Sequence, residues 1–237
     1  MPPLLDIKGL VKRYGSFKAV DGISFSVNRN EVFGLLGPNG AGKSTLMWML
    51  TGLSKPSGGD ATVEGISIRE KAKLKRLIGF APQEDSFYHS LTVEGNLQFF
   101  GELYGMKKKQ AKARAEELIK ALMLEDKAKA KASALSGGMK RRLNMAIALM
   151  HKPKLLFLDE PTVGVDPISR AALWKVIENI KKEVTIVIST HYLTEAERLC
   201  DRFAIQAKGK IIAVGSVKSL AKPGESLEDL FIRLVGR

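Results

Sequence analysis

Apolar residues in this chain gather in short, nearly unbroken runs separated by longer segments of mixed polarity. Several of these runs have the length and composition of strands buried on both faces, as the strands of a parallel sheet are. They span residues 31–36, 77–81, 154–158 and 184–190. The pattern therefore predicts an α/β fold with a mainly parallel sheet.

The first part of the chain predicts an additional β layer. Residues 4–10 and 17–27 have the pattern of antiparallel strands, and the segment 12–16 between them has the composition of a turn. A further strand is expected over residues 61–68, after a turn rich in Gly, Pro and Ser. We expect these strands to form an antiparallel edge layer beside the parallel sheet.

The middle of the chain changes to a helical pattern, from about residue 91 to residue 151. Helices are predicted over residues 92–106, 107–124 and 136–150. Strand character then returns, with a helix over residues 168–182, strands over 202–206 and 211–214, and a final helix over 227–234. We therefore predict a single domain over residues 1–237, with a core of about 1–90 and 152–237 and an inserted helical subdomain of about 91–151.

Composition limits the cellular compartment and the class of protein that this sequence fits. No apolar stretch reaches the roughly 18 residues of a membrane-spanning helix, and the start of the chain lacks the pattern of a signal peptide. The lone Cys200 excludes an internal disulfide and is expected to pack as a small apolar side chain. We expect a cytosolic protein.

The formal net charge of +13 is compatible with nucleic acid, an anionic membrane or a solvated lysine-rich surface. Many of the cations fall between Lys107 and Lys131, interleaved with alanine rather than with aromatic residues. Because nucleobases stack on aromatic side chains, this segment is a poor single-strand binding platform. An exposed helical face is the favoured interpretation, and a membrane-facing or acidic-partner role is the alternative.

One glycine-rich segment between a predicted strand and a predicted helix carries the clearest chemistry. It fits the phosphate-binding pattern G-x-x-x-x-G-K-[ST], in which glycines let backbone N–H groups face an anion at the start of a helix. In this pattern Lys43 reaches the β- and γ-phosphates and Ser44 binds Mg²⁺. The segment consists of Gly37, Pro38, Asn39, Gly40, Ala41, Gly42, Lys43, Ser44 and Thr45.

Polar residues also end the other buried strands, at the edge where a parallel sheet binds its ligand. Asp159 has the position of a Walker B aspartate and is expected to hold Mg²⁺, and Glu160 to orient and deprotonate the attacking water. His191 is expected to hydrogen-bond the γ-phosphate. Gln83 is expected to contact the metal or the water and to link the core to the helical insertion.

A second Ser/Gly-rich helix start, Ser136-Gly137-Gly138, is also suited to an anion, although the chain has a single phosphate-binding loop. With its neighbours Leu135 and Met139, this segment resembles the LSGGQ signature of ABC transporters. The whole chain, from about Leu4 to Arg237, is similar to the ATP-binding subunits of that family. In the family, two such cassettes dimerise head to tail, so the signature of one contacts the γ-phosphate held by the other.

The resemblance implies further roles. Tyr14, which on residue type alone is an ordinary half-exposed turn residue, would stack on adenine, and Gln83 would be the Q-loop glutamine. Asp166 would make a polar contact across the dimer from the D-loop, where Val163 replaces a common serine. Met139 replaces the signature glutamine. Together with the basic residues 140–142, these departures resemble the exporter-type subgroup whose membrane subunits are separate chains.

These implications define the expected function. We expect a subunit that binds ATP and Mg²⁺, pairs with a second copy or a homologous cassette, and powers export through a separate transmembrane permease. It would lie on the inner face of the membrane through this partner, which would dock near Gln83 and Phe87-Tyr88. The alternative is a soluble ABC-type ATPase acting on nucleic acid or in cofactor assembly. The transported substrate and the preference for ATP over GTP are left open.

Overall fold

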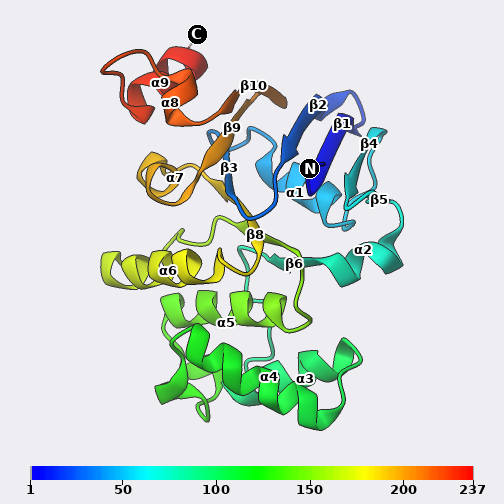
Figure 1. The fold of residues 1–237 in the computed structure, drawn as a ribbon, viewed down its shortest axis with the longest axis vertical. Helices are drawn as coiled ribbons and strands as arrows, with labels where there is room; N and C mark the ends of the chain where they lie inside the picture. The colour runs from blue at the N-terminus through cyan, green and yellow to red at the C-terminus, as the bar shows by residue number, and fades with distance from the viewer. Residues whose placement is uncertain (1, 237) are drawn as a thin grey trace.

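A six-stranded sheet forms the centre of the computed structural model, which describes residues 2–236 (Figure 1). Its strands are parallel except for the antiparallel edge pair β10–β9. In spatial order they are β10 (Lys210–Gly215), β9 (Arg202–Ala207), β3 (Val32–Leu36), β8 (Thr185–Thr190), β7 (Leu155–Asp159) and β6 (Ile78–Ala81). Every residue of β3, β7 and β8 is buried, which accounts for the apolar runs in their sequences. The predicted α/β class with a mainly parallel sheet is confirmed.

A second, antiparallel sheet confirms the predicted edge layer. Its order is β2 (Phe17–Val27), β1 (Leu5–Tyr14), β4 (Gly58–Val63) and β5 (Ile66–Ser67). The turn predicted at residues 12–16 was too long, because β1 continues to Tyr14, which pairs with Phe17. The charged side chains that suggested a loop are tolerated here because they lie on exposed or half-buried positions of the hairpin.

The single strand predicted over residues 61–68 was also wrong. Glu64 and Gly65 both have positive φ values, 50° and 79°, and they turn the chain between β4 and β5. The strand begins earlier than predicted, at Gly58, and pairs with both β1 and β5. Gly65 was the residue that could have indicated this turn, because glycine permits the left-handed backbone that a tight turn requires.

Helices cover the two faces of the central sheet (Figure 1). Helix α1 (Lys43–Leu50) and the antiparallel sheet enclose one apolar cluster against the sheet. The other face is covered by α5 (Gly137–Leu149) and α6 (Pro167–Ile180), with α3 (Val93–Leu103) and α4 (Lys108–Ala121) stacked beyond α5. Among residues 2–236, no helix has both the length and the hydropathy needed to cross a bilayer.

Shorter helices complete the chain, and most of them were not predicted. The C-terminal helix α9 (Leu227–Val235) was expected, and it packs with α7 (Leu193–Leu199) on a third apolar cluster that includes Phe203. The helices that the sequence pattern did not indicate are α2 (Lys71–Leu77), α7 (Leu193–Leu199) and α8 (Val217–Leu220). Each has at most seven residues, which is too short to show a helical repeat of apolar positions. The chain also forms 3₁₀ turns at Glu125–Lys127 and Ala132–Ala134.

Helix α5 lies so close to strand β6 that the contact requires glycine. A Cβ atom on Gly79 would overlap the backbone oxygen of Ala148, which cannot move without displacing the helix. We expect Gly79→Ala to lower the free energy of unfolding by about 1–3 kcal/mol, the usual cost of overpacking a core. Urea unfolding measures this change. Gly58→Ala is the matched control because its added Cβ would make only an ordinary contact, 3.6 Å from Val11 Cβ, and equal midpoints for the two variants would contradict the argument.

Candidate active site

The predicted phosphate-binding loop connects β3 to α1 at the carboxyl edge of the sheet. Gly40 and Gly42 have φ values of 78° and 100°, so the loop follows a path that other residues rarely adopt. A Cβ atom on Gly42 would also overlap the backbone oxygen of Ala19. At the start of α1, Lys43 is only 5% exposed, and its Nζ donates to the carbonyl oxygens of Gly37 and Pro38 at 2.9 and 3.2 Å. The loop thus places a buried ammonium group beside the free N–H groups of a helix start.

The end of β7 brings a carboxylate to this loop. The hydroxyl of Ser44 lies 3.4 Å from Asp159 Oδ1, and the hydroxyl of Ser189 donates to the same oxygen at 2.5 Å. Burial raises the pKa of Asp159, and the hydrogen bonds from Ser189 and Ser44 oppose this effect. Mg²⁺ prefers oxygen ligands and combines one or two protein groups with phosphate oxygens and water. The adjacent oxygens of Ser44 and Asp159 therefore fit the predicted metal role.

Glu160 contacts two of the other predicted site residues. Its Oε1 lies 3.4 Å from Lys43 Nζ and 3.3 Å from His191 Nδ1, and its side chain is 11% exposed. The residue has a left-handed backbone, φ 46°, which is uncommon for a side chain of this kind. Its N–H donates to the backbone oxygen and the hydroxyl of Ser189 at 3.1 and 3.0 Å, so strand β8 holds this conformation. A strained, braced carboxylate beside a lysine and a histidine is typical of a reactive centre.

Other predicted residues lie outside this cluster. Tyr14 ends β1 and is half exposed, with Lys12 Nζ 5.1 Å from the centre of its ring. Gln83 is exposed in the segment after β6, and within residues 2–236 its side chain has no hydrogen-bond partner. Asp166 caps α6 by accepting from the N–H groups of Ile168 and Ser169, both at 3.0 Å. Hydrogen bonds from Ser169 hold the pKa of Asp166 below its usual value.

The second Ser/Gly-rich segment begins α5, well away from α1 (Figure 1). Ser136 caps this helix by accepting from Met139 N at 3.4 Å. Ser136 and Gly137 are exposed, and a Cβ on Gly137 would meet no atom within 4 Å. Gly138 is different: it is buried, and a Cβ there would approach Ser169 Oγ to 2.9 Å. The segment therefore presents an open helix start that no group of this chain covers among the residues described.

A buried asparagine that the sequence analysis missed links α5 to the segment around Gln83. Asn144 is 1% exposed, and its Oδ1 accepts from both the N–H and the hydroxyl of Ser86 at 3.0 Å. Its Nδ2 donates to the carbonyl oxygens of Glu84 and Pro82 at 2.7 and 3.4 Å. An asparagine within an otherwise apolar helical stretch was the available signal, since buried amides are retained where they have partners.

A buried carboxyl group lies behind His191 and was also missed. Glu195 on α7 is 1% exposed and accepts from Trp174 Nε1 at 3.3 Å. Burial raises the pKa of this carboxyl, and the hydrogen bond from Trp174 acts in the opposite direction. Glu195 thus connects helix α7, which follows His191 in the chain, to helix α6.

Comparison with known sequences identifies relatives over most of the chain. Residues 20–163 match the family model described as ABC transporter. The chain is 46% identical to the linearmycin resistance ATP-binding protein LnrL of Bacillus subtilis over 92% of its own length and 70% of that protein. It is 45% identical to the Nod factor export ATP-binding protein I of Mesorhizobium japonicum, over 91% of this chain and 64% of that one. The probable multidrug ABC transporter ATP-binding protein YbhF of Escherichia coli is 40% identical, and the match spans 42% of it.

Solved structures agree with this result. A structure described as the ATP-binding subunit of an ABC transporter superposes with a TM-score of 0.86 at 31% identity, covering 98% of this chain and 99% of that one. The cbiO1 protein from Clostridium perfringens, part of the transporter complex cbiONQ, superposes with a TM-score of 0.85 at 29% identity. That match covers 94% of this chain and 92% of cbiO1.

Proposed function

The chain belongs to the ABC transporter family as an ATP-binding subunit, and we propose that it hydrolyses MgATP at a site shared by two cassettes. ATP hydrolysis is the general activity of this family. We propose that the energy of this reaction powers a separate membrane-spanning partner. One observation carries the proposal. Glu160 lies within 3.4 Å of both Lys43 and His191, directly beside the Ser44–Asp159 pair. This arrangement combines a base, a phosphate-binding cation and metal-binding oxygens at one edge of the sheet.

Each residue has a defined part in the reaction. The N–H groups of residues 39–45 and the ammonium of Lys43 bind the β- and γ-phosphates and offset their charge. Ser44 and Asp159 would hold Mg²⁺, and Gln83 would supply a further oxygen ligand; the bound metal would add to the neutralisation of phosphate charge. Glu160 orients the attacking water and accepts its proton, and His191 donates a hydrogen bond to the γ-phosphate.

The second helix start gives the site its other half. Ser136, Gly137 and Gly138 of one copy would contact the γ-phosphate held by the loop of another copy or of a homologous cassette, in a head-to-tail dimer. The exposure of Ser136 and Gly137 supports this role, because a helix start of this kind attracts anions. Asp166 would add a polar contact across the dimer while it caps α6. Tyr14 would stack on the adenine of the bound nucleotide.

The division of the chain follows from the same proposal. Residues of about 1–90 and 152–237 would act as the nucleotide-binding core, and residues of about 91–151 as a helical subdomain that carries the signature. Helices α3, α4 and α5 all fall within the second range. Binding of two ATP molecules would favour the closed dimer because each nucleotide contacts both copies, and hydrolysis would release it.

Export is the proposed direction of transport. The relatives named above are ATP-binding proteins of linearmycin resistance and Nod factor export and a probable multidrug transporter. The chain itself would lie at the inner face of the membrane through its permease partner. Since the chain spans 64% and 42% of two of these relatives, the whole protein's partners and cargo are part of the proposal.

An exposed aromatic cluster marks the proposed docking surface for the permease. Tyr88 and Phe99 are 52% and 41% exposed, and their rings meet edge to face with 5.0 Å between centres. Phe100 packs against both rings. The cluster lies between the segment that contains Gln83 and helix α3. Exposed apolar surface of this kind is typical of a protein–protein contact.

Co-purification with the membrane partner tests the proposal. We expect the double variant Tyr88→Ser, Phe99→Ser to lose the partner and the partner-dependent stimulation of ATP hydrolysis, while the isolated chain keeps its basal rate. Leu53→Ser is the control, because Leu53 is 65% exposed and lies elsewhere on the surface. If the double variant still co-purified and was still stimulated, the docking surface would be elsewhere.

A further inference from the structure

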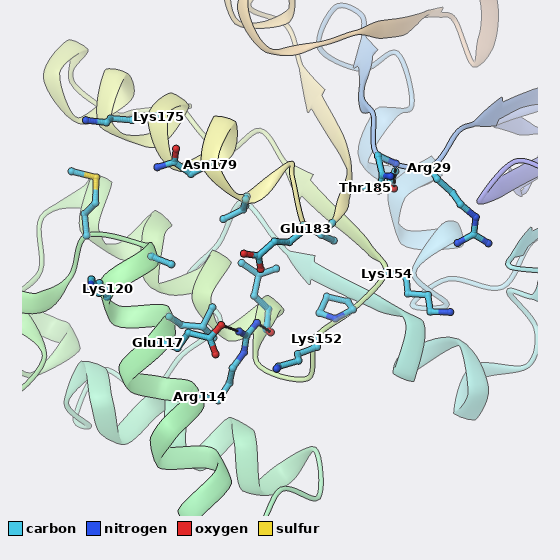
Figure 2. Close-up of a pocket in the computed structure, with 18 of the residues that line it drawn as sticks. Arg29, Arg114, Glu117, Lys120, Lys152, Lys154, Lys175, Asn179, Glu183 and Thr185 are labelled. Atoms are coloured by element: carbon cyan, nitrogen blue, oxygen red, sulfur yellow. Dashed lines mark hydrogen bonds and ion pairs between the residues drawn. The ribbon is translucent and has the colours of Figure 1, made fainter.

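A basic cavity of about 860 Å³ lies at the edge of the sheet opposite the phosphate-binding loop (Figure 2). Asn30, Lys154 and Thr185 line it, and they precede or begin β3, β7 and β8, whereas the loop follows the end of β3. Helices α4 and α6 form its other walls, so the helical segment and the core both contribute. The residues proposed for ATP hydrolysis do not line this cavity.

Positive charge dominates the lining. Its cations are Arg29, Arg114, Lys120, Lys152, Lys154 and Lys175, and its acids are Glu117 and Glu183. Some of these charges are already paired: Arg29 and Lys154 both bind Glu64, and Arg114 binds Glu117 at 2.6 Å. Lys120, Lys152 and Lys175 take part in no ion pair within residues 2–236. Three unpaired ammonium groups therefore share the cavity with one unpaired carboxylate, that of Glu183, which leaves an excess of positive charge among the residues described.

Arg114 supplies a fixed and buried cation at this site. Its side chain is 10% exposed, and one guanidinium nitrogen donates to Leu149 O at 3.0 Å while another binds Glu117. Its Nε is buried and has no hydrogen-bond partner. In Figure 2, Arg114 and Lys152 lie on one side of the cavity, and Glu183 extends toward them from the end of α6. An unpaired donor on a buried guanidinium is costly, which favours an additional acceptor in this cavity.

The backbone around the cavity is also unusual. Asn30, Met123 and Lys152 line it with φ values of 58°, 56° and 55°, in the left-handed region that favours glycine. Glu64, which pairs with two of the cations, has φ 50°. The remaining positive-φ residues other than glycine are Glu160, in the proposed active site, and Lys208. Met123 and Lys152 adopt this conformation just after α4 and α5 end, as residues that close a helix commonly do.

We propose that this cavity binds a small phosphate polyanion, such as a chain of two or three phosphates. The cavity has the volume of a small-molecule site, and ammonium and guanidinium groups are the usual ligands of phosphate. None of its lining residues is aromatic, so recognition falls on phosphate rather than on a stacked base. Glu183 has no cationic partner in residues 2–236 and would repel the anion. Removing the charge of Glu183 should therefore strengthen binding, whereas removing the charges of the lysines should weaken it.

Calorimetric titration with inorganic tripolyphosphate tests this inference on the full chain. The titration uses a Lys43→Ala background, which weakens phosphate binding at the loop after β3. We expect saturable binding that the double variant Lys152→Gln, Lys175→Gln weakens by at least about tenfold, because two charged contacts are lost. Glu183→Gln should tighten binding about threefold by removing a repelling charge. Added NaCl should weaken binding.

The double variant Lys55→Gln, Lys218→Gln is the matched control, since it removes the same charge from exposed positions outside the cavity. It should bind tripolyphosphate as the background does. The proposal would be overturned by the absence of saturable binding, by equal affinities for the two double variants, or by weaker binding to Glu183→Gln. Binding of a poly-glutamate peptide in place of tripolyphosphate would also overturn it.

Discussion

Glu160→Gln should keep ATP bound and reduce turnover by at least about 100-fold, and by as much as 10,000-fold, the usual range for loss of a general base. The amide has the size of the carboxylate but cannot accept a proton from water. It also loses the charge that lies 3.4 Å from Lys43, which frees the ammonium for the phosphates. Phosphate release at saturating ATP measures turnover, and equilibrium binding of a fluorescent nucleotide measures affinity.

Glu116→Gln provides the matched control for this variant. Glu116 is exposed on α4 and makes no ion pair within residues 2–236, so the same chemical change should leave both turnover and affinity unaltered. Two results would count against the assignment of Glu160. One is full ATPase activity in Glu160→Gln, and the other is a loss of turnover that only reflects weaker nucleotide binding.

Gly137→Asp should abolish most of the ATPase activity without weakening the fold. Because a Cβ at this position meets no atom within 4 Å, the new side chain can be accommodated, and a carboxylate in the first turn of α5 favours the helix. The same carboxylate would repel the γ-phosphate that we propose to bind there. We expect a loss of at least about 100-fold in turnover, comparable to loss of one stabilising donor. Gly137→Ala should keep most of the activity, and neither variant should lower the thermal midpoint.

A mixing experiment distinguishes an active site shared between two copies from an active site formed within one chain. Lys43→Ala damages the phosphate-binding loop, and Gly137→Asp damages the helix start, so each variant alone should be nearly inactive. In a two-fold symmetric dimer of one copy of each, one site receives both changes and the other receives neither. An equal mixture should regain about a quarter of the wild-type activity, because about half of the dimers are mixed and each has one intact site. A mixture as inactive as its components would contradict the shared site.

The sequence was sufficient to predict the parts of the fold that repeat a simple pattern. Buried strands such as Val32–Leu36 are apolar throughout, and the glycine spacing before Lys43 requires a loop that follows such a strand. The topology of a parallel sheet then predicts that the polar residues at the ends of these strands lie together at its carboxyl edge. The contacts of Glu160 with Lys43 and His191 join residues that this reasoning had placed at one edge.

Other features depend on contacts between distant residues and could not be predicted in this way. Helix α2 has one buried residue, Leu74, and therefore no repeat that marks it as helical. The hydrogen bonds of Asn144 reach residues about 60 positions earlier, so the local sequence marks the asparagine but does not indicate its partners. The basic cavity collects residues from Leu4 to Thr185, so its charge is dispersed in the sequence and concentrated only in the folded chain.

The four hydrogen bonds of Asn144 have a mechanical consequence for coupling. They fasten the segment at Pro82–Ser86, next to the proposed docking surface, to the same helix that begins at Gly137. A force applied at Tyr88 therefore cannot move that segment alone, because breaking a buried amide's hydrogen bonds is costly. In the function proposed above, α5 would therefore couple the γ-phosphate contact at Gly137 to the surface around Tyr88.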